Sequence, residues 1–276
     1  MSARRQDRSE EPGEPGPAGG DAPSAPAASG SAAGENGEAA AAAEDESLAG
    51  RPDTPVPPLA ELQEAMEWAF RGEEIAPAVL EAYARHARMV LEANREVNLT
   101  AIVDPREMAA KHYLDSWRVT RQVPLYGRSI LDVGTGAGFP GLPIALAESD
   151  VRVALLDSTQ KRIHFVQRSI AELGVRNASA VWDRAEEHLA RNAYDVVLMR
   201  AVSSVRENVR TLRKVRHSHK ALVMLKGPSW SREVRAGERE AERLGFKLDT
   251  VWEHELPGEM GQRAILVYRA PGAQGG

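Results

Sequence analysis

A glycine-rich turn is the stretch of this sequence best suited to chemistry. Gly134, Gly136 and Gly138 remove side chains from a turn that follows the apolar run 129–133, so a ligand can approach the backbone closely. Pro140 suits the first residue of a helix, because proline lacks a backbone N–H and the N–H at that position would have no partner within the helix in any case. A strand, a glycine turn and a helix in this order predict a cofactor site at the carboxyl end of a parallel sheet.

Two carboxylates near the turn indicate which cofactor it fits. Residues 136–141 match the GxGxxG pattern of dinucleotide sites, and Asp157 follows at about the distance of an acid that binds a ribose. Asp132 ends the strand before the turn, where a carboxylate is unfavourable beside a pyrophosphate but favourable beside an ammonium or sulfonium. The glycines alone could simply pack a helix on a strand. With both acids present, S-adenosylmethionine (SAM) is favoured over a dinucleotide, held in part by Gly134 and Gly136.

The composition of the 276-residue chain limits its class. The absence of cysteine excludes disulfides, thiolate metal sites and the cysteine nucleophile of pyrimidine C5 methyltransferases. No apolar run reaches the roughly 20 residues of a membrane helix, and no signal-peptide core opens the chain, so a soluble, cytoplasmic protein is expected. Residues 1–53 hold eleven acids against four bases, a net −7 that leaves +2 for the rest of a chain of net charge −5. A mildly basic body is compatible with a nucleic-acid partner.

The chain divides by composition into unequal parts. Its start is rich in Ala, Gly, Pro and Glu, and cannot bury enough apolar surface to offset the entropy of ordering. Apolar residues at helical spacing follow, with helix starts at Pro77 and at Asp104-Pro105. We expect a disordered acidic tail at 1–55, an N-terminal helical layer at 56–127, a SAM-binding core at 128–270 and a C-terminal tail at 271–276.

Apolar strands and helical stretches alternate through the predicted core. Strands are predicted at 129–133, 151–156, 178–182, 194–199, 220–225, 248–254 and 263–269, and helices at 140–148, 160–173, 205–217 and 230–244. Such alternation predicts a parallel sheet with right-handed crossovers. The link 256–262 is too short for a crossover helix, so the last two strands should run antiparallel. The expected α/β fold is a Rossmann-like, mostly parallel seven-stranded sheet with one reversed strand, which resembles the class I SAM-dependent methyltransferases.

Three cations stand where predicted strands end or begin. Arg200 follows the fourth strand, Lys226 the fifth, and Arg263 opens the last. Each alone could be a surface cation, but neither a metal-ligand cluster nor the Asn/Asp-Pro-Pro-aromatic motif of amino-group methyltransferases accompanies them. Together they favour a polyanionic substrate, and we predict that they are catalytic residues.

The combined motifs resemble one family, the bacterial small-subunit ribosomal RNA guanine-N7 methyltransferases, RsmG or GidB. The resemblance is carried by residues 94–100, 104–107, 112–116, 132–143, 156–162, 200–201, 225–227 and 261–263. It implies SAM-dependent methylation of N7 of one guanine, position 527, in 16S ribosomal RNA. The partner would be that RNA or the small ribosomal subunit, and the enzyme a monomer without a metal. Ala264 stands where the family often has a histidine.

Residue roles follow from the same resemblance. It implies that SAM is held by Gly134, Phe139, Ala185, Glu186 and Arg200. The acids at 186–187 could equally open a helix. Guanine N7 already carries a lone pair, so its attack needs no general base, and positioning supplies the catalysis. Candidate RNA contacts are His112, Lys161, Arg162 and Arg184, although His112 fits a buried structural histidine at least as well.

Two other classes of protein share parts of this pattern. An NAD(P)-dependent oxidoreductase on a similar sheet is the alternative function, but it requires a Tyr/Lys or His dyad that the sequence does not present. A methyltransferase-like module that binds RNA without activity would need only the basic body.

Overall fold

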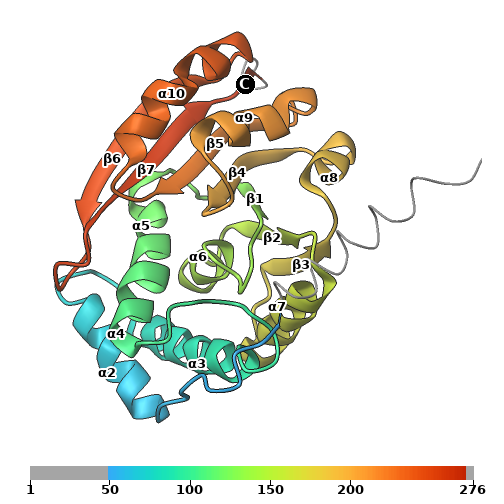
Figure 1. Ribbon diagram of the computed structural model, residues 1–276. Helices are drawn as coiled ribbons and strands as arrows, with labels where there is room; N and C mark the ends of the chain where they lie inside the picture. The colour runs from blue at the N-terminus through green and yellow to red at the C-terminus, as the bar shows by residue number, and fades with distance from the viewer. Residues whose placement is uncertain (1–48, 272–276) are drawn as a thin grey trace, which may run out of the picture. The chain divides into compact units, whose positions relative to one another are not determined.

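The computed structural model of the chain describes residues 49–271. Most of the predicted acidic tail and nearly all of the predicted C-terminal tail lie outside these residues. The described part is a seven-stranded sheet covered by helices on both faces (Figure 1). No helix in it is both long enough and apolar enough to span a membrane.

The sheet has the strand order β3-β2-β1-β4-β5-β7-β6. Its strands are β1 (Ser129–Val133), β2 (Arg152–Asp157), β3 (Ala178–Trp182), β4 (Tyr194–Arg200), β5 (His219–Lys226), β6 (Lys247–Glu255) and β7 (Gln262–Arg269). The strands β1 to β5 pair in parallel, and β7 runs antiparallel to both β5 and β6. The predicted fold class is therefore confirmed. The order reverses between β1 and β4, and ligands of open α/β sheets bind at the carboxyl ends beside such a reversal.

Two hydrophobic clusters lie on opposite faces of the sheet, and Figure 1 shows their helices on its two sides. The first joins α6 (Gly141–Ala147) and α7 (Gln160–Leu173) to the N-terminal helices α2 (Leu59–Ala69), α3 (Pro77–Ala93), α4 (Pro105–Met108) and α5 (Asp115–Gln122). The second lies under α8 (Ala185–Arg191), α9 (Val205–Thr211) and α10 (Trp230–Arg243). The N-terminal helical layer thus covers one face of the core only.

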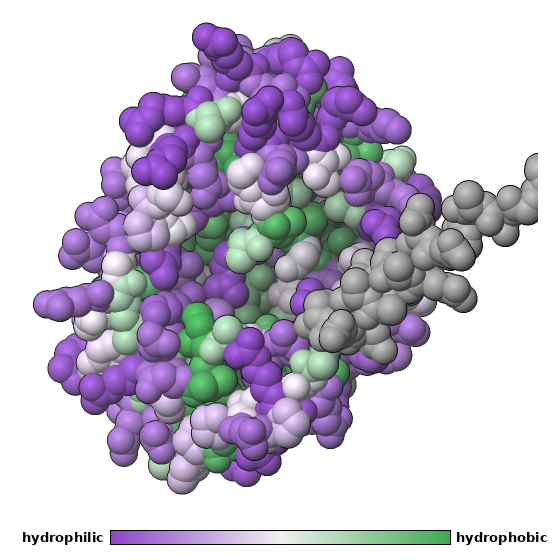
Figure 2. Space-filling model, viewed as in Figure 1, coloured by the Kyte–Doolittle hydropathy of each residue, from purple (hydrophilic) through white to green (hydrophobic). Residues whose placement is uncertain are grey.

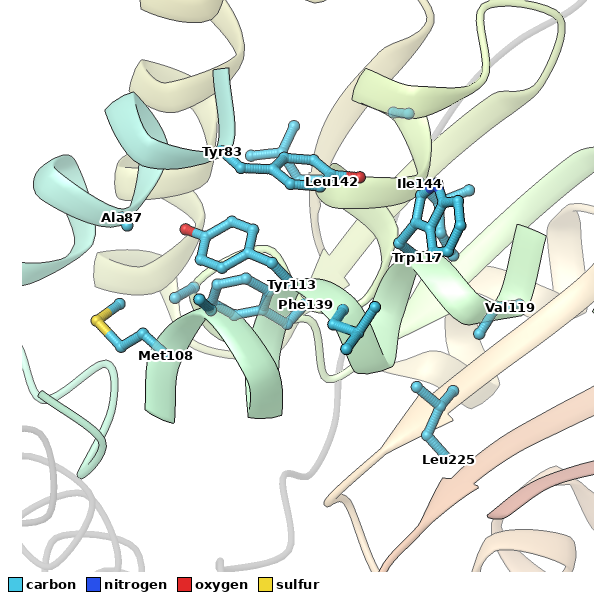
Figure 3. Close-up of a cluster of buried hydrophobic side chains, with 14 of the residues drawn as sticks. Tyr83, Ala87, Met108, Tyr113, Trp117, Val119, Phe139, Leu142, Ile144 and Leu225 are labelled. Carbon is cyan, nitrogen blue, oxygen red and sulfur yellow. The ribbon is translucent and has the colours of Figure 1, made fainter. Parts of the chain in front are cut away.

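Aromatic contacts fix this helical layer to the glycine turn. The rings of Tyr113 and Phe139 meet edge to face with centroids 5.1 Å apart, and those of Tyr83 and Tyr113 are also 5.1 Å apart. The Tyr83 hydroxyl donates to the carbonyl of Pro143 at 2.8 Å, and Trp117 packs nearby (Figure 3). Because buried Tyr hydroxyls need a partner, this bond allows Tyr83 to be fully buried against α6.

Local structure departs from the sequence-based expectation in three places. The helix that begins at Pro105 contains a π-helical segment, η1 (Ala109–Leu114), before α5 continues it. Helix α6 begins at Gly141 rather than Pro140, because the Gly141 N–H is capped by the Asp132 carboxylate at 2.9 Å. The predicted helix 205–217 ends at Thr211, followed by the 3₁₀ turn η2 (Leu212–Lys214). The undecided stretch at 185–191 is the helix α8.

The last residues of the predicted disordered tail are packed on the body. Ala49 forms an antiparallel bridge with Val97. Thr54 is 3% exposed, and its hydroxyl accepts from the side-chain amide of buried Asn94 at 3.1 Å. The Arg51 N–H also donates to the Asn94 carbonyl at 2.8 Å. The ordered body therefore begins by residue 49, and the predicted boundary at residue 55 was too late.

This packing predicts that two N-terminal truncations differ in stability. A chain beginning at residue 56 should have an unfolding free energy about 1–3 kcal/mol below that of a chain beginning at residue 49, because buried Asn94 loses its bonds to the Thr54 hydroxyl and the Arg51 N–H. Urea unfolding of both chains measures the difference. Thr54→Val in the full chain should reproduce part of it, and equal stabilities would contradict the packing.

Candidate active site

Two adjacent pockets open at the carboxyl ends of the parallel strands. The first, here called the turn pocket, has a volume of about 360 Å³ and is lined from the ends of β1, β2 and β3. The second, the cation pocket, has a volume of about 710 Å³ and is lined from the ends of β4 and β5, the start of β7 and segment η1. Ala201 and Val202 line both pockets, so these two residues form the wall between them.

Neither pocket is the largest hollow in the described residues. A pocket of about 790 Å³ between the end of α2 and the β6–β7 loop contains none of the predicted site residues. On the face shown in Figure 2, hydrophobic residues gather near the centre and hydrophilic residues surround them. The two pockets at the strand ends are therefore identified by their residues and position, not by size.

The turn pocket gathers four of the predicted cofactor residues. Gly134, Asp157, Ala185 and Glu186 all line it. The Asp157 side chain is buried, and its two oxygens accept from the backbone N–H groups of Gly136 at 3.0 Å and Thr159 at 2.9 Å. Asp157 therefore joins the glycine turn to Thr159, the N-cap residue of α7, and it lies at the predicted place beside the turn.

Glycine is required at the head of this turn. Gly134 has φ of +70°, a left-handed conformation that strains other residues. A Cβ there would also lie 3.0 Å from the Cγ2 of Val202. The backbone of the turn after β1 thus lies so close to Val202 that a side chain at position 134 would crowd it.

Two predicted cofactor residues lie beneath the turn instead of in a pocket. Asp132 is fully buried and lines neither pocket, and its Oδ2 accepts from the Thr135 hydroxyl at 2.6 Å and from the Gly141 N–H. The expectation that its carboxylate points into the crevice was wrong, because those two donors hold it under the turn. Phe139 is likewise 3% exposed and packs among aromatic rings (Figure 3).

Burial raises the pKa of Asp132 to about 6, although its hydrogen bonds from Thr135 and Gly141 lower it. A carboxyl group whose pKa is higher in the folded state stabilises the fold below its unfolded pKa of about 4, and that stability is lost as the pH rises through about 6. Ionised Asp132 at neutral pH therefore carries a cost in folding free energy.

Asp132→Asn should remove this pH dependence. Relative to the natural chain, the variant should gain on the order of 2 kcal/mol of unfolding free energy between pH 4.5 and pH 7.5, the part of the full linkage that falls within this window. Urea unfolding at several pH values measures the gain, with exposed Asp150→Asn as the control. Parallel stability curves for the natural chain and Asp132→Asn would contradict the assignment.

The cation pocket brings the three predicted catalytic residues together. Arg200, Lys226 and Arg263 all line it, as do the carboxylates of Asp115 and Glu233. The three cations come from three strands, so only the sheet topology makes them neighbours. Their environments differ, and the differences separate their roles.

Arg200 is held in place on three sides. Its Nη1 donates to the Lys111 carbonyl at 3.1 Å and to His112 Nδ1 at 3.1 Å, and its guanidinium lies 5.1 Å from the centre of the Phe139 ring. Its buried Nε has no hydrogen-bond partner among the described residues. Buried donors are nearly always paired in native proteins, so the unpaired Nε sets Arg200 apart from the other two cations of this pocket.

Lys226 and Arg263 differ in how their charges are used. Lys226 is 8% exposed, lies 2.9 Å from Glu233 and donates to the Ser203 carbonyl. Arg263 is half-buried, and its Nη1 donates to the carbonyl of its own neighbour Gln262 at 2.9 Å. Arg263 is therefore the more available cation of the two.

His112 lines the cation pocket but is held by protein groups. Its Nδ1 faces a donor of Arg200, so it must accept, and its Nε2–H then donates to the Thr100 hydroxyl at 2.9 Å. Burial and the positive charge of Arg200 lower the pKa of His112 well below its usual value, so the ring is neutral. His112 is thus a buried histidine held by Arg200 and Thr100, as the structural interpretation of this residue expects.

A polar chain supports this histidine from the N-terminal layer. The Asn94 Oδ1 accepts from the N–H groups of Leu99 at 2.8 Å and Thr100 at 3.0 Å. The sequence marks residues 94–100 only as a motif, and their polar, irregular composition is the signal that they do something other than extend a helix. Asn94 and Thr100 are therefore supporting residues that sequence reasoning did not identify.

The remaining predicted RNA contacts do not gather in the cation pocket. Arg162 and Arg184 line the turn pocket instead, and the Arg162 guanidinium lies 3.7 Å from Asp157. Lys161 belongs to neither lining. Asp115, which lines the cation pocket and bonds His254 at 3.1 Å, was not predicted as a site residue, although it lies in the recognised motif 112–116.

The sheet order, the single reversed strand, the glycine turn after β1 and the acid that ends β2 define the class I, Rossmann-like SAM-dependent methyltransferases. Within that class, the sequence model of the GidB family, rRNA small subunit methyltransferase G, matches residues 79–260. The chain therefore belongs to this family.

Two named relatives agree with this membership in sequence, and one solved structure is given with them for its fold. The chain is 36% identical over 195 residues to ribosomal RNA small subunit methyltransferase G of Solibacter usitatus, covering 70% of this chain and 91% of the relative. It is 33% identical over 202 residues to the protein of the same name from Carboxydothermus hydrogenoformans, covering 72% and 86%. A solved SAM-dependent methyltransferase from Aquifex aeolicus aligns with a TM-score of 0.44 and 20% identity over 60% of this chain and 94% of that chain.

Family membership confirms the recognition made from the motifs. The chain is a SAM-dependent methyltransferase of small-subunit ribosomal RNA, and the alternative of an NAD(P)-dependent oxidoreductase is not supported. The roles of individual residues remain predictions to be tested.

Proposed function

We propose that this enzyme transfers the methyl group of SAM to N7 of one guanine in 16S ribosomal RNA, the guanine at position 527 that the family resemblance implies. The main support for this proposal is that the turn pocket and the cation pocket share one wall, formed by Ala201 and Val202. A cofactor in the first and a polyanion at the second would bring their reacting atoms together at that wall.

The residues of the turn pocket fit a nucleoside cofactor. Gly134 leaves open backbone, and Asp157 offers carboxylate oxygens whose remaining lone pairs can accept ribose hydroxyls. Ala185 and Glu186 place one apolar and one polar contact beside the end of β3, where the adenine would lie. When bound, SAM supplies a methyl group made reactive by its sulfonium.

The reaction requires no proton transfer by the protein. The N7 lone pair forms the new N–C bond while the S–C bond breaks and its electrons return to sulfur. The positive charge passes from the sulfonium to the purine, so cations near the ring would not stabilise the product. We therefore assign Arg200 and Arg263 to binding phosphates or the guanine carbonyl, with catalysis by positioning.

Mass spectrometry tests the reaction directly. The protein, labelled SAM and 16S ribosomal RNA lacking this modification should yield one labelled 7-methylguanosine per RNA, within the fragment containing position 527. Small subunits and naked RNA, compared under the same conditions, identify the form of the substrate. Label in another nucleoside, or at another guanine, would overturn the assignment of the target.

The cofactor assignment predicts the effect of Asp157→Asn. Loss of a charged acceptor should weaken SAM binding by about 1.5–3 kcal/mol, or roughly 10- to 150-fold in Kd. Calorimetry measures the affinity, and Glu187→Gln, an exposed acid on the same helix as Glu186, is the matched control. An unchanged affinity would mean that Asp157 serves only the backbone of the turn.

The substrate assignment predicts the effect of Arg263→Ala. RNA binding should weaken, and the slope of log affinity against log salt should fall by about one unit for each phosphate that Arg263 neutralises, while SAM affinity stays the same. Arg269→Ala removes an equal charge at the far end of β7, where Arg269 pairs with Asp249. Similar salt slopes for both variants would show that Arg263 makes no special contact.

A further inference from the structure

We propose that Glu233 and Lys226 form a clamp that positions Ala201 and Val202, the wall between the two pockets. This inference rests on the proposed function, which makes the wall the place where methyl transfer occurs. It gives Glu233, on α10, a positioning role, and it assigns the Lys226 ammonium to the protein and not to RNA phosphate.

The environment of Lys226 is that of a structural ion pair. Its side chain is 7% exposed, its Nζ lies 2.9 Å from Glu233 Oε2, and it donates to the Ser203 carbonyl. A lysine ammonium has three donors, and two are engaged by protein groups. A phosphate would have to compete with a carboxylate already in contact.

The same pair holds the loop that follows β4. Glu233 Oε2 also accepts from the Val205 N–H at 3.2 Å. The Ser203 carbonyl accepts both from Lys226 and from Asn208 Nδ2, the latter at 3.3 Å. Residues 203–205 are thus fixed from β5, α9 and α10, and Figure 1 shows the two helices side by side.

The wall residues Ala201 and Val202 gain little stability from their own conformation and burial. Ala201 has φ of +53°, a left-handed conformation that costs a non-glycine residue about 1–2 kcal/mol. Val202 is 44% exposed, and burial therefore contributes little to its position. Because the wall directly precedes residues 203–205, the bonds to Lys226 and Glu233 are the nearest fixed points that maintain its conformation.

The clamp and a phosphate-binding Lys226 predict opposite results for Glu233→Ala. A phosphate-binding lysine would be freed from its carboxylate, so RNA would bind more tightly and the salt slope would steepen by about one unit. A clamp would instead be broken, and the wall would lose its position while RNA affinity changed little.

The experiment compares Glu233→Ala with Glu238→Ala, which removes an equal charge from an exposed position on the same helix. For Glu233→Ala we expect kcat to fall about tenfold to a hundredfold, as for a displacement of about 1 Å at a reacting site, with KM for RNA and the salt slope unchanged. Backbone amides 201–205 should exchange with solvent about tenfold faster, and Glu238→Ala should change neither quantity. Tighter RNA binding with unchanged amide exchange would overturn the clamp.

A second variant guards against a simple loss of folding. Lys226→Met keeps most of the aliphatic stem and should also increase exchange at residues 201–205, and the double variant should be no slower in catalysis than the worse single one. Additive losses would overturn the clamp. Amide exchange does not depend on methyl transfer. If the natural enzyme transferred no methyl group, the proposed function would be refuted, and the amide exchange of residues 201–205 would still test the clamp.

Discussion

The buried ring of Phe139 lies at the centre of the contact between the glycine turn and the N-terminal helical layer. His112 stacks on it at 4.6 Å, Tyr113 and His86 pack against it at 5.1 and 5.4 Å, and the Arg200 guanidinium lies over it. Phe139 belongs to the glycine turn, whereas its histidine and tyrosine neighbours belong to the N-terminal helices. Together with the hydrogen bond from Tyr83 to the Pro143 carbonyl, Phe139 therefore joins the turn to the helices that shape the cation pocket.

This arrangement explains why a helical layer precedes the sheet. The layer supplies His112, whose neutral ring accepts from Arg200, and the π-helical segment supplies the Lys111 carbonyl that accepts a second bond from it. Single π-helical turns occur often at functional sites. The turn pocket is lined by the core alone, whereas the cation pocket is shared between the core and the N-terminal helical layer.

The sequence predicted best what depends on local chemistry. Strand limits, the reversed last strand and the glycine turn follow from patterns within a few residues, and the gathering of Arg200, Lys226 and Arg263 follows from topology. The orientation of the Asp132 side chain could not be predicted from the sequence. It depends on the positions of its donors, the Thr135 hydroxyl and the Gly141 N–H, in the folded turn. The pairing of Lys226 with Glu233 joins β5 to α10, and residue types alone do not reveal which acid a buried lysine will meet.

The place of β7 has a consequence for how the enzyme is made. β7 is the last strand in the chain, yet it lies between β5 and β6, so β6 has no neighbour in the sheet until β7 has left the ribosome. The residues that line the turn pocket all lie at or before Thr211, whereas the lining of the cation pocket is complete only with Arg263. During synthesis, the residues of the turn pocket therefore leave the ribosome first. Under the proposed clamp, however, the wall that both pockets share becomes fixed only when Lys226 and Glu233 have followed, so neither pocket reaches its final shape before the fifth strand and α10 are made.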